Sequence, residues 1–209
     1  MEKRHLARLL QATKEQRAET VCPRGDPVEL NELSIPGCHS PCPAVRGGAG
    51  AVLVKTIVEA SLLRAGLRVD FKEHYYSVSC REVIRGTDFQ VPPHDYDKAV
   101  FCLCGKALDV VVDLRTGSPT YGRPLVITLE GRDVRGTYVP RGCAPGFLAD
   151  DTILMYHVTS EYAPQSDLGI RWDRIPFDWP TRNPVISERD GGLPALSAFR
   201  SPFSFEERG

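Results

Sequence analysis

The run Ala107-Leu108-Asp109-Val110-Val111-Val112-Asp113-Leu114 decides the fold, because such a valine-rich stretch is typical of a buried β-strand. A second run, Ala99-Val100-Phe101-Cys102-Leu103-Cys104-Gly105, precedes it, and Gly105 predicts a turn between two strands. Other short runs between glycine, proline and aspartate predict strands at 69–71, 75–79, 82–85, 125–129, 136–140 and 152–158. No helical pattern separates these runs, which favours an all-β sandwich or barrel.

The segments before this β-rich region differ in character. Leucines at helical spacing predict a short surface helix over 3–19, and apolar residues over 54–65 predict a second helix that stops at Gly66. The intervening segment 22–50 is rich in proline, glycine, cysteine and serine, which is typical of a loop or linker. A proline-rich, aromatic-dotted tail over 176–209 is expected to wrap the surface.

These patterns predict three regions. They are an N-terminal helix and Pro/Gly/Cys-rich arm (1–50), a β-domain (51–195) and a C-terminal tail (196–209).

The composition excludes several classes of protein. The chain has 209 residues, of which 42% are hydrophobic and 25% charged, as in a globular domain with a substantial core. Its 26 Lys and Arg against 27 Asp and Glu leave a net charge of −1, which argues against nucleic acid or an anionic membrane as partner. No apolar run approaches the roughly 20 residues of a membrane helix. The N-terminus lacks an apolar signal segment, so we expect a cytoplasmic protein.

Seven cysteines are an odd number scattered along the chain, which favours reduced thiols over a disulfide framework. The group Cys22, Cys38, His39 and Cys42 permits a zinc site, but it lacks the tight double pair of a zinc finger. Small residues in a loop are the simpler interpretation. We expect no metal.

Four blocks of sequence carry a more specific signal. The first is Arg85-Gly86-Thr87-Asp88-Phe89-Gln90-Val91-Pro92-Pro93, followed by Lys98. The second block, 108–122, contains Leu-Asp-Val-Val-Val-Asp-Leu-Arg and then Gly-Ser-Pro-Thr-Tyr-Gly. The third, 139–164, contains Val-Pro-Arg-Gly-Cys-Ala-Pro-Gly-Phe-Leu, Met-Tyr and Glu-Tyr-Ala-Pro. The fourth, 169–190, contains Gly-Ile-Arg-Trp, Asp-Trp-Pro and Ile-Ser-Glu-Arg-Asp. In this order they resemble the dTDP-4-dehydrorhamnose 3,5-epimerase family, small cupin enzymes that act on nucleotide-linked 4-keto sugars.

The resemblance implies an all-β cupin jelly roll (a double-stranded β-helix), here with an N-terminal helical extension. It also implies an isomerase that uses no metal and no organic cofactor, with a dTDP-linked sugar as substrate and a homodimer as the assembled state. A homodimer would also protect the open edges of such a sheet.

Epimerisation beside a ketone needs a base, a group that holds the enolate, and an acid on the opposite face. The resemblance assigns Lys98 to the enolate oxygen and Tyr156 to the acid, with Asp88 at the position of the base and Asp190 as the partner of that base. The positions expected to contact substrate are Glu73, Tyr75, Arg85, Asp109, Tyr162, Asp167 and Arg189. On residue type alone, Tyr156 is also compatible with an ordinary strand aromatic and Lys98 with a solvated charge.

This chain departs from the family pattern where the base is expected. The family has histidine where this sequence has Asp88, and a second family histidine is replaced by Pro145. An aspartate, with an ordinary pKa of about 3.9, is a weaker proton acceptor near neutral pH than histidine. Two carboxylates sharing one site would raise one pKa and restore a base. The alternatives are an epimerase-inactive cupin that binds a nucleotide sugar, or a pocket recruited for another rearrangement such as a cyclisation.

Overall fold

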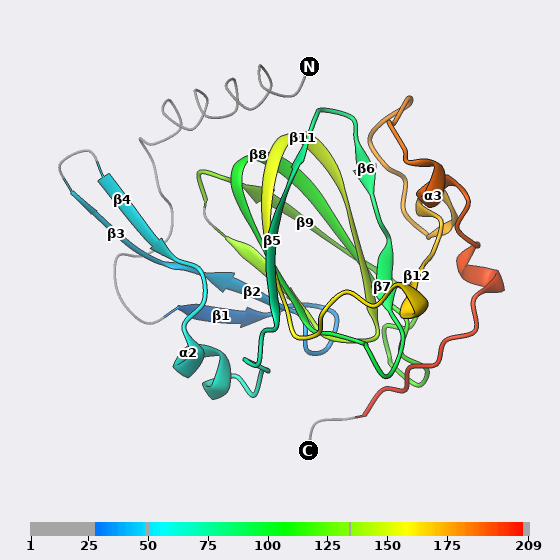
Figure 1. Cartoon of the computed structure of the whole chain (residues 1–209), viewed down its shortest axis with the longest axis horizontal. Helices are drawn as coiled ribbons and strands as arrows, with labels where there is room; N and C mark the ends of the chain where they lie inside the picture. Colours follow the sequence, from blue (N-terminus) through cyan, green and yellow to red (C-terminus); the bar gives the residue numbers. More distant parts are fainter. Residues whose placement is uncertain (1–27, 49–50, 134, 207–209) are drawn as a thin grey trace.

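A computed structural model describes residues 28–48, 51–133 and 135–206 (Figure 1). The helix expected over 3–19 lies outside the described residues. Antiparallel strands dominate the described part of the chain, which confirms the all-β prediction.

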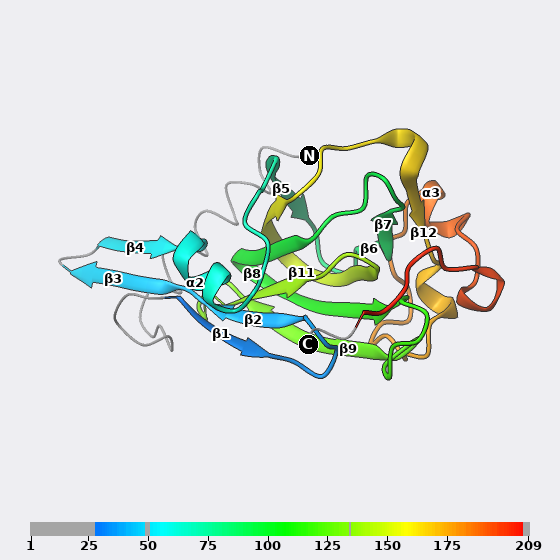
Figure 2. The ribbon, with the colours of Figure 1, turned by 90° about the horizontal axis from the view of Figure 1, so that it is seen from below.

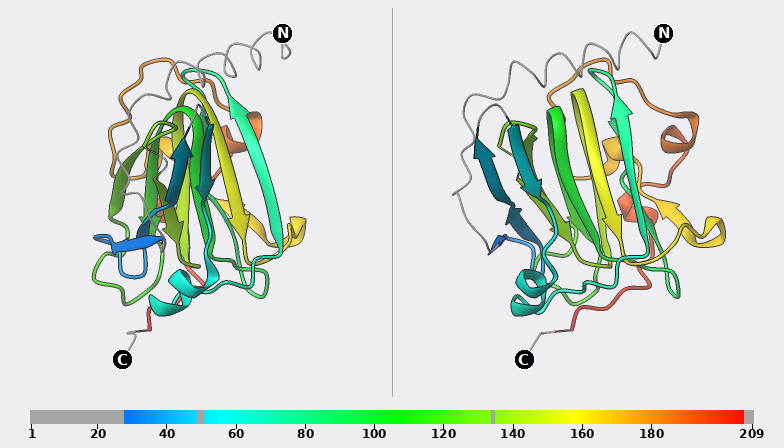
Figure 3. Two further views of the ribbon diagram at one scale, coloured as in Figure 1. Left: turned by 90° about the vertical axis from the view of Figure 1, so that its left-hand side faces the viewer. Right: turned by 60° about the vertical axis from the view of Figure 1, so that its left-hand side comes forward.

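One eight-stranded sheet forms the body of the protein, with the strand order β1-β2-β10-β8-β11-β5, and with β6 added to β11 and β9 to β8. Figure 3 shows β8, β11 and β5 side by side in this curved sheet. The strands are β1 (Glu29–Glu32), β2 (His39–Cys42), β5 (Glu73–Ser79), β6 (Ile84–Arg85), β8 (Lys98–Asp113), β9 (Pro124–Glu130), β10 (Gly136–Val139) and β11 (Cys143–Val158).

Two smaller pairs complete the β-structure: β7 (Asp88–Gln90) with β12 (Asp167–Gly169), and β3 (Ala44–Gly48) with β4 (Ala51–Lys55). The β3–β4 hairpin projects away from the body (Figure 2). The short helices are α2 (Glu59–Arg64), η2 (Pro164–Ser166), η3 (Trp172–Arg174), α3 (Glu188–Gly191) and η4 (Leu196–Ala198). In Figure 1, α3 and the C-terminal segment lie on the side of the sheet where β6, β7 and β12 are found.

The strands β8 and β11 form the longest pair, and they correct two expectations. Residues 98–113 are one strand of 16 residues, so Gly105 is not a turn between two strands. Gly105 has φ +73° and lies where the pairing with β11 shifts register, between Asp150 and Ile153. The strand expected over 152–158 begins at Cys143, because the segment around Pro145 and Gly146 pairs with β8 despite its composition.

The expectation of a loop over 22–50 is wrong for its described part. β1 and β2 pair residue by residue and join the main sheet through β10. Pro41, which has no backbone N–H, lies on β2 opposite Leu30. The proline- and glycine-rich composition predicted a loop because these residues are typical of loops, although here they occupy strand and turn positions at the edge of the sheet.

The second predicted helix is shorter than its apolar pattern. β4 extends through Lys55, and α2 covers only Glu59–Arg64, since β-branched residues at 54 and 56–58 favour extended backbone. Its C-terminal stop at Gly66, with φ +68°, is confirmed. The strand expected over 69–71 is absent, whereas those over 75–79 and 125–129 lie within β5 and β9.

The tail is not only a surface wrapping. Trp179 and Phe203 are buried in the core cluster that contains Phe89 and Val110. The three-region division of the chain remains a prediction.

Among the described cysteines, Cys42 departs from the expectation of reduced thiols. Cys42 is disulfide-bonded, whereas Cys38, Cys80, Cys102, Cys104 and Cys143 form no disulfide. A bonded Cys42 is not available to a zinc ion.

Within the ranges the structure describes, no helix is long and apolar enough to cross a membrane.

The close approach of β11 to Gly105, where the pairing shifts register, gives a test of the fold. A Cβ at Gly105 would collide with the carbonyl oxygen of Asp151, whereas a Cβ at Gly117, which also has positive φ, meets nothing within 4 Å. Gly117→Ala should therefore cost only the left-handed strain, about 1 kcal/mol, and Gly105→Ala about 3 kcal/mol because of the added clash. Urea denaturation of both variants measures the difference. Equal losses would contradict the close approach of β8 to β11.

Candidate active site

A cavity of about 1000 Å³ is lined by strands of the main sheet, including β6, and by residues of β7 and α3. The charged side chains that line it are Arg85, Asp88, Lys98, Asp109, Arg189 and Asp190. Its volume lies at the upper end of the range of about 300–1,000 Å³ that is usual for ligand sites. Tyr75, Ser77 and Tyr156 line the same cavity from the sheet.

The irregular pairing of β8 around Gly105 explains why Lys98 and Asp109 share this cavity. In a regular strand, residues eleven positions apart point to opposite faces. The pairing of β8 with β11 is irregular opposite Gly105, so the in-and-out alternation of β8 side chains before and after Gly105 is offset by one residue. Asp109 lies directly across from Phe147, which also lines the cavity. One strand therefore contributes an ammonium group and a carboxyl group to a single site.

Lys98 and Tyr156 lie together, on the neighbouring strands β8 and β11. The Lys98 Nζ atom is 5.8 Å from the centre of the Tyr156 ring. The Tyr156 hydroxyl is 3.0 Å from Ser77 Oγ, and its ring stacks on Tyr75 with centroids 4.8 Å apart. Burial raises the pKa of Tyr156 to about 12, although Ser77 and Lys98 act to lower it. Tyr156 is therefore a neutral phenol that can donate a proton.

Lys98 is buried, and an aromatic residue that the sequence did not single out covers it. Its Nζ atom lies 5.2 Å from the ring centre of Tyr96. Burial by itself lowers the pKa of Lys98, but Tyr96, Tyr75 and Asp88 outweigh burial and raise it above its ordinary value. Lys98 is therefore an ammonium group held in place between aromatic rings. The only signal for Tyr96 in the sequence is its position two residues before Lys98.

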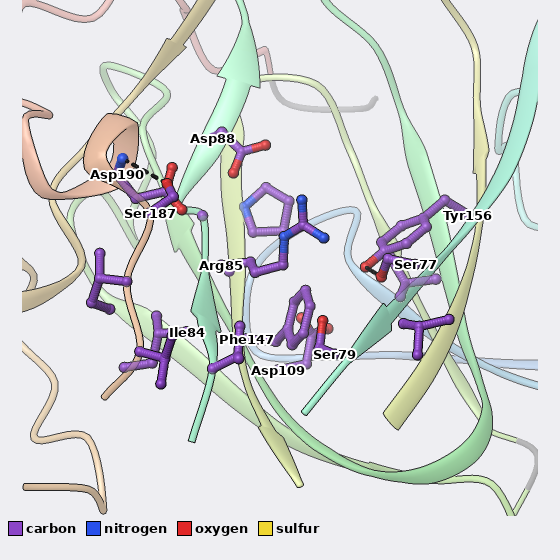
Figure 4. Close-up of a pocket in the computed structure, with 18 of the residues that line it drawn as sticks. Ser77, Ser79, Ile84, Arg85, Asp88, Asp109, Phe147, Tyr156, Ser187 and Asp190 are labelled. Atoms are coloured by element: carbon purple, nitrogen blue, oxygen red, sulfur yellow. Dashed lines mark hydrogen bonds between the residues drawn. The ribbon is translucent and has the colours of Figure 1, made fainter. Parts of the chain in front are cut away.

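Asp88 lies across the cavity from Tyr156 (Figure 4). Burial raises its pKa, the charges of Lys98 and Arg189 lower it, and the nearby carboxylates Asp190 and Asp167 raise it. The net direction is upward, which makes Asp88 a better proton acceptor than an exposed aspartate.

Asp190 lies on the same side of the cavity as Asp88 (Figure 4). Its backbone N–H donates to Ser187 Oγ, at 3.0 Å, which fixes the start of α3. Its side chain pairs with Arg189, and among the described residues no hydrogen bond joins it to Asp88. The two carboxyl groups thus interact through their charges.

Arg85 points into the cavity between Asp88 and Tyr156 (Figure 4). Within the described part of the chain its guanidinium group has no ion pair. It is therefore available to an anionic or hydroxyl-bearing ligand.

Three of the expected contact residues lie outside the cavity lining. The Tyr162 N–H donates to the Glu73 carboxylate at 3.1 Å, and the Tyr162 hydroxyl is 3.4 Å from Asp167. Asp167 is in turn paired with Arg189, at 2.6 Å. The structure thus links these residues to one edge of the site, and their contact with substrate remains a prediction.

No described histidine lines the cavity. Pro145 occupies the wall where the family resemblance implies a second histidine. His74 and His157 instead contact each other, with Nδ1 atoms 2.6 Å apart, beside Phe71. Among the described residues no cluster of three or more His, Cys, Asp or Glu could hold a metal ion.

The carboxyl groups, the ammonium group and the phenol in this antiparallel β-fold are the proton acceptors and donors that an isomerase needs. Residues 32–198 match the family model for dTDP-4-dehydrorhamnose 3,5-epimerase, so the chain belongs to this family.

Individual relatives agree with this assignment. A dTDP-4-dehydrorhamnose 3,5-epimerase from Mycolicibacterium smegmatis is 35% identical over 176 residues, covering 79% of this chain and 85% of the relative. The crystal structure of a 4-keto-6-deoxy sugar epimerase from the novobiocin biosynthetic gene cluster of Streptomyces spheroides matches with a TM-score of 0.79 and 33% identity, covering 86% and 92% of the two chains. A dTDP-6-deoxy-D-glucose-3,5-epimerase from Legionella pneumophila, in complex with dTDP-4-keto-L-rhamnose, matches with a TM-score of 0.81 and 25% identity, covering 86% and 100%. The cupin fold and the epimerase-like isomerase class expected from the sequence are thus confirmed.

Asp109 gives a test of the electrostatics of the cavity. It is only 2% exposed, and its Oδ2 atom has no hydrogen-bond partner among the residues that the structure describes. Burial raises its pKa to about 6, from an ordinary 3.8, which corresponds to about 3 kcal/mol. The folded state therefore holds this proton more tightly than the unfolded state. The free energy of unfolding should fall as the pH rises from about 4 to about 6, since the unfolded chain releases the proton first.

Asp109→Asn should remove this loss and stabilise the protein at pH 7 by up to about 3 kcal/mol. Urea denaturation between pH 4 and pH 7 measures the effect, with the exposed Asp178→Asn as control. The same pH dependence in wild type and Asp109→Asn would contradict a raised pKa at the buried Asp109.

Proposed function

We propose that this isomerase epimerises a dTDP-linked 4-keto-6-deoxy sugar at a carbon next to the ketone. The observation that carries the proposal is the placement of Asp88 and Tyr156 on opposite sides of one cavity, with Lys98 beside the phenol (Figure 4). Inversion requires proton removal from one face and proton return to the other, and these two groups have the chemistry for both steps.

The proposed reaction begins when the Asp88 carboxylate accepts the proton from the carbon next to the ketone. The electron pair of the broken C–H bond forms the enolate, whose oxygen the Lys98 ammonium group stabilises. Tyr156 then donates its hydroxyl proton to the same carbon from the opposite face. Solvent reprotonates the phenolate and takes the proton from Asp88, so the protein ends unchanged.

The substrate class rests on the charge of the cavity and on the relatives. Arg85 offers a cation that is unpaired among the described residues, which suits the diphosphate or the sugar hydroxyls. Solved relatives contain TDP or a dTDP-linked sugar. The expected cytoplasmic location belongs to the same proposal.

Deuterium exchange tests this function. The protein is incubated in D2O with dTDP-4-keto-6-deoxyglucose, and NMR follows deuterium at the carbons beside the ketone. Wild type should incorporate deuterium and form an epimer, and Asp88→Asn should lower the rate by about 10²–10⁴. Tyr156→Phe should still exchange but should not invert, because Asp88 returns the proton to the face it came from. Tyr121→Phe, an exposed tyrosine outside the cavity, is the control.

The variant Asp88→His tests in the same experiment whether residue 88 is the base. A histidine there would have its ordinary pKa near 6.5 and would be favoured as a cation by Asp190, so exchange at neutral pH should rise. Absence of exchange in wild type, together with a thermal shift on adding the sugar nucleotide, would overturn the epimerase proposal in favour of a binding protein.

We further propose that the protein is a homodimer. The β3–β4 hairpin exposes Val52 and Leu53 (48% and 54%) away from the body (Figure 2), and among the described strands β5 is an edge of the main sheet. A second copy would cover such apolar and unpaired surfaces. Light scattering should give twice the chain mass, and Val52→Asp with Leu53→Asp should shift the protein to monomer. A monomeric wild type would contradict this.

A further inference from the structure

Arg189 bridges two carboxylates at the edge of the cavity. Its Nη2 atom is 2.6 Å from Asp167 Oδ2 on β12, and its Nη1 atom is 3.1 Å from Asp190 Oδ1 on α3. Arg189 also lines the cavity that contains Asp88. A single guanidinium group thus joins the two acidic residues whose charges act on the proposed base.

The charges around Asp88 explain why such a bridge is needed. The charges that act on it are Lys98 from β8, Asp167 from β12, and Arg189 and Asp190 from α3. Arg85 from β6 also points into the cavity beside Asp88 (Figure 4). Without Arg189, Asp190 and Asp167 would lose the cation that pairs with both, and neighbouring carboxylates without such a cation do not all stay ionised at neutral pH.

The identity of the base makes this charge balance specific to the chain. A histidine base becomes a cation when it takes up a proton, so an adjacent Asp190 stabilises it. An aspartate base is an anion before it takes up a proton, so the same Asp190 repels it. The position of Asp190 thus favours a histidine base. It disfavours an ionised Asp88 unless a cation neutralises Asp190.

We propose that Arg189 is a positioning residue that neutralises Asp190 and Asp167 and thereby keeps Asp88 ionised as the base. This inference rests on the proposed function, since it concerns the same base. Burial lowers the pKa of Arg189, but the charges of Asp88 and Asp167 outweigh burial and raise it, so the guanidinium group remains a cation throughout the working range.

The pH profile of deuterium exchange provides the first test. In Arg189→Met, the acid limb of kcat/KM should move up by about one pH unit, because Asp88 then holds its proton more tightly. Arg189→Lys keeps the charge and should restore the wild-type limb. Arg132→Gln, which removes an exposed arginine paired with Glu130 outside the cavity, is the matched control. A limb that does not move in Arg189→Met would overturn the proposal.

A second measurement separates this inference from the proposed function. In free protein labelled with ¹³C at the aspartate carboxyl carbons, NMR follows the titration of Asp88, whose signal is the one missing in Asp88→Asn. The midpoint should rise in Arg189→Met and fall in Asp167→Asn, which removes a carboxylate instead of a cation. These opposite shifts are expected even if wild type exchanges no deuterium, in which case only the proposed function fails. Equal midpoints in all three proteins would overturn the role of Arg189.

Discussion

The interruption in the pairing of β8 with β11 is the constraint on which the site depends. Both strands are 16 residues long, and their pairing shifts register twice near Gly105, between Asp150 and Ile153 and between Ile153 and Leu154. In a regular strand Lys98 and Asp109 would point to opposite faces of the sheet. The interruption gives both ends of β8 access to one cavity, so the irregular stretch around Gly105 determines which charged groups line it.

Parts of this arrangement could be predicted from the sequence. The valine-rich run of β8 and the short runs between turn residues in β5 and β9 predicted strands, since local pattern decides the type of such elements. The four family blocks placed Asp88, Lys98 and Tyr156 in one site, as the structure has them, because those residues lie within or beside the blocks. The placement of Asp190 on the side of Asp88 followed in the same way. Their catalytic roles remain a proposal.

Other parts depend on contacts between distant residues and could not be predicted. A glycine with positive φ serves equally in a turn and in a bulge, and only the partner strand decides between them, which is why Gly105 was misassigned. The strands β1 and β2 are too short and too rich in proline to show a pattern, and they form because β10 offers them an edge. Tyr96 has only its position two residues before Lys98 as a signal, since its importance comes from the burial of Lys98 beside its ring. The ion pairs of Arg189 are likewise visible only when β12 and α3 are brought together.

The electrostatics of the cavity follow from replacing one kind of base by another. A histidine site is stable with an unpaired aspartate beside it, because the base acquires a positive charge during the reaction. A carboxylate base begins with the negative charge and loses it during the reaction, so the same surroundings oppose its starting state. A carboxyl base in this geometry therefore requires a cation on the side of the neighbouring carboxylates, separate from the cation that holds the enolate. Lys98 acts on Asp88 through its charge but forms no ion pair with Asp190 or Asp167 among the described residues, and in the proposed reaction it holds the enolate oxygen beside the phenol. Arg189 is placed for the first purpose and Lys98 for the second, which is the division of charge that proton removal by an aspartate demands.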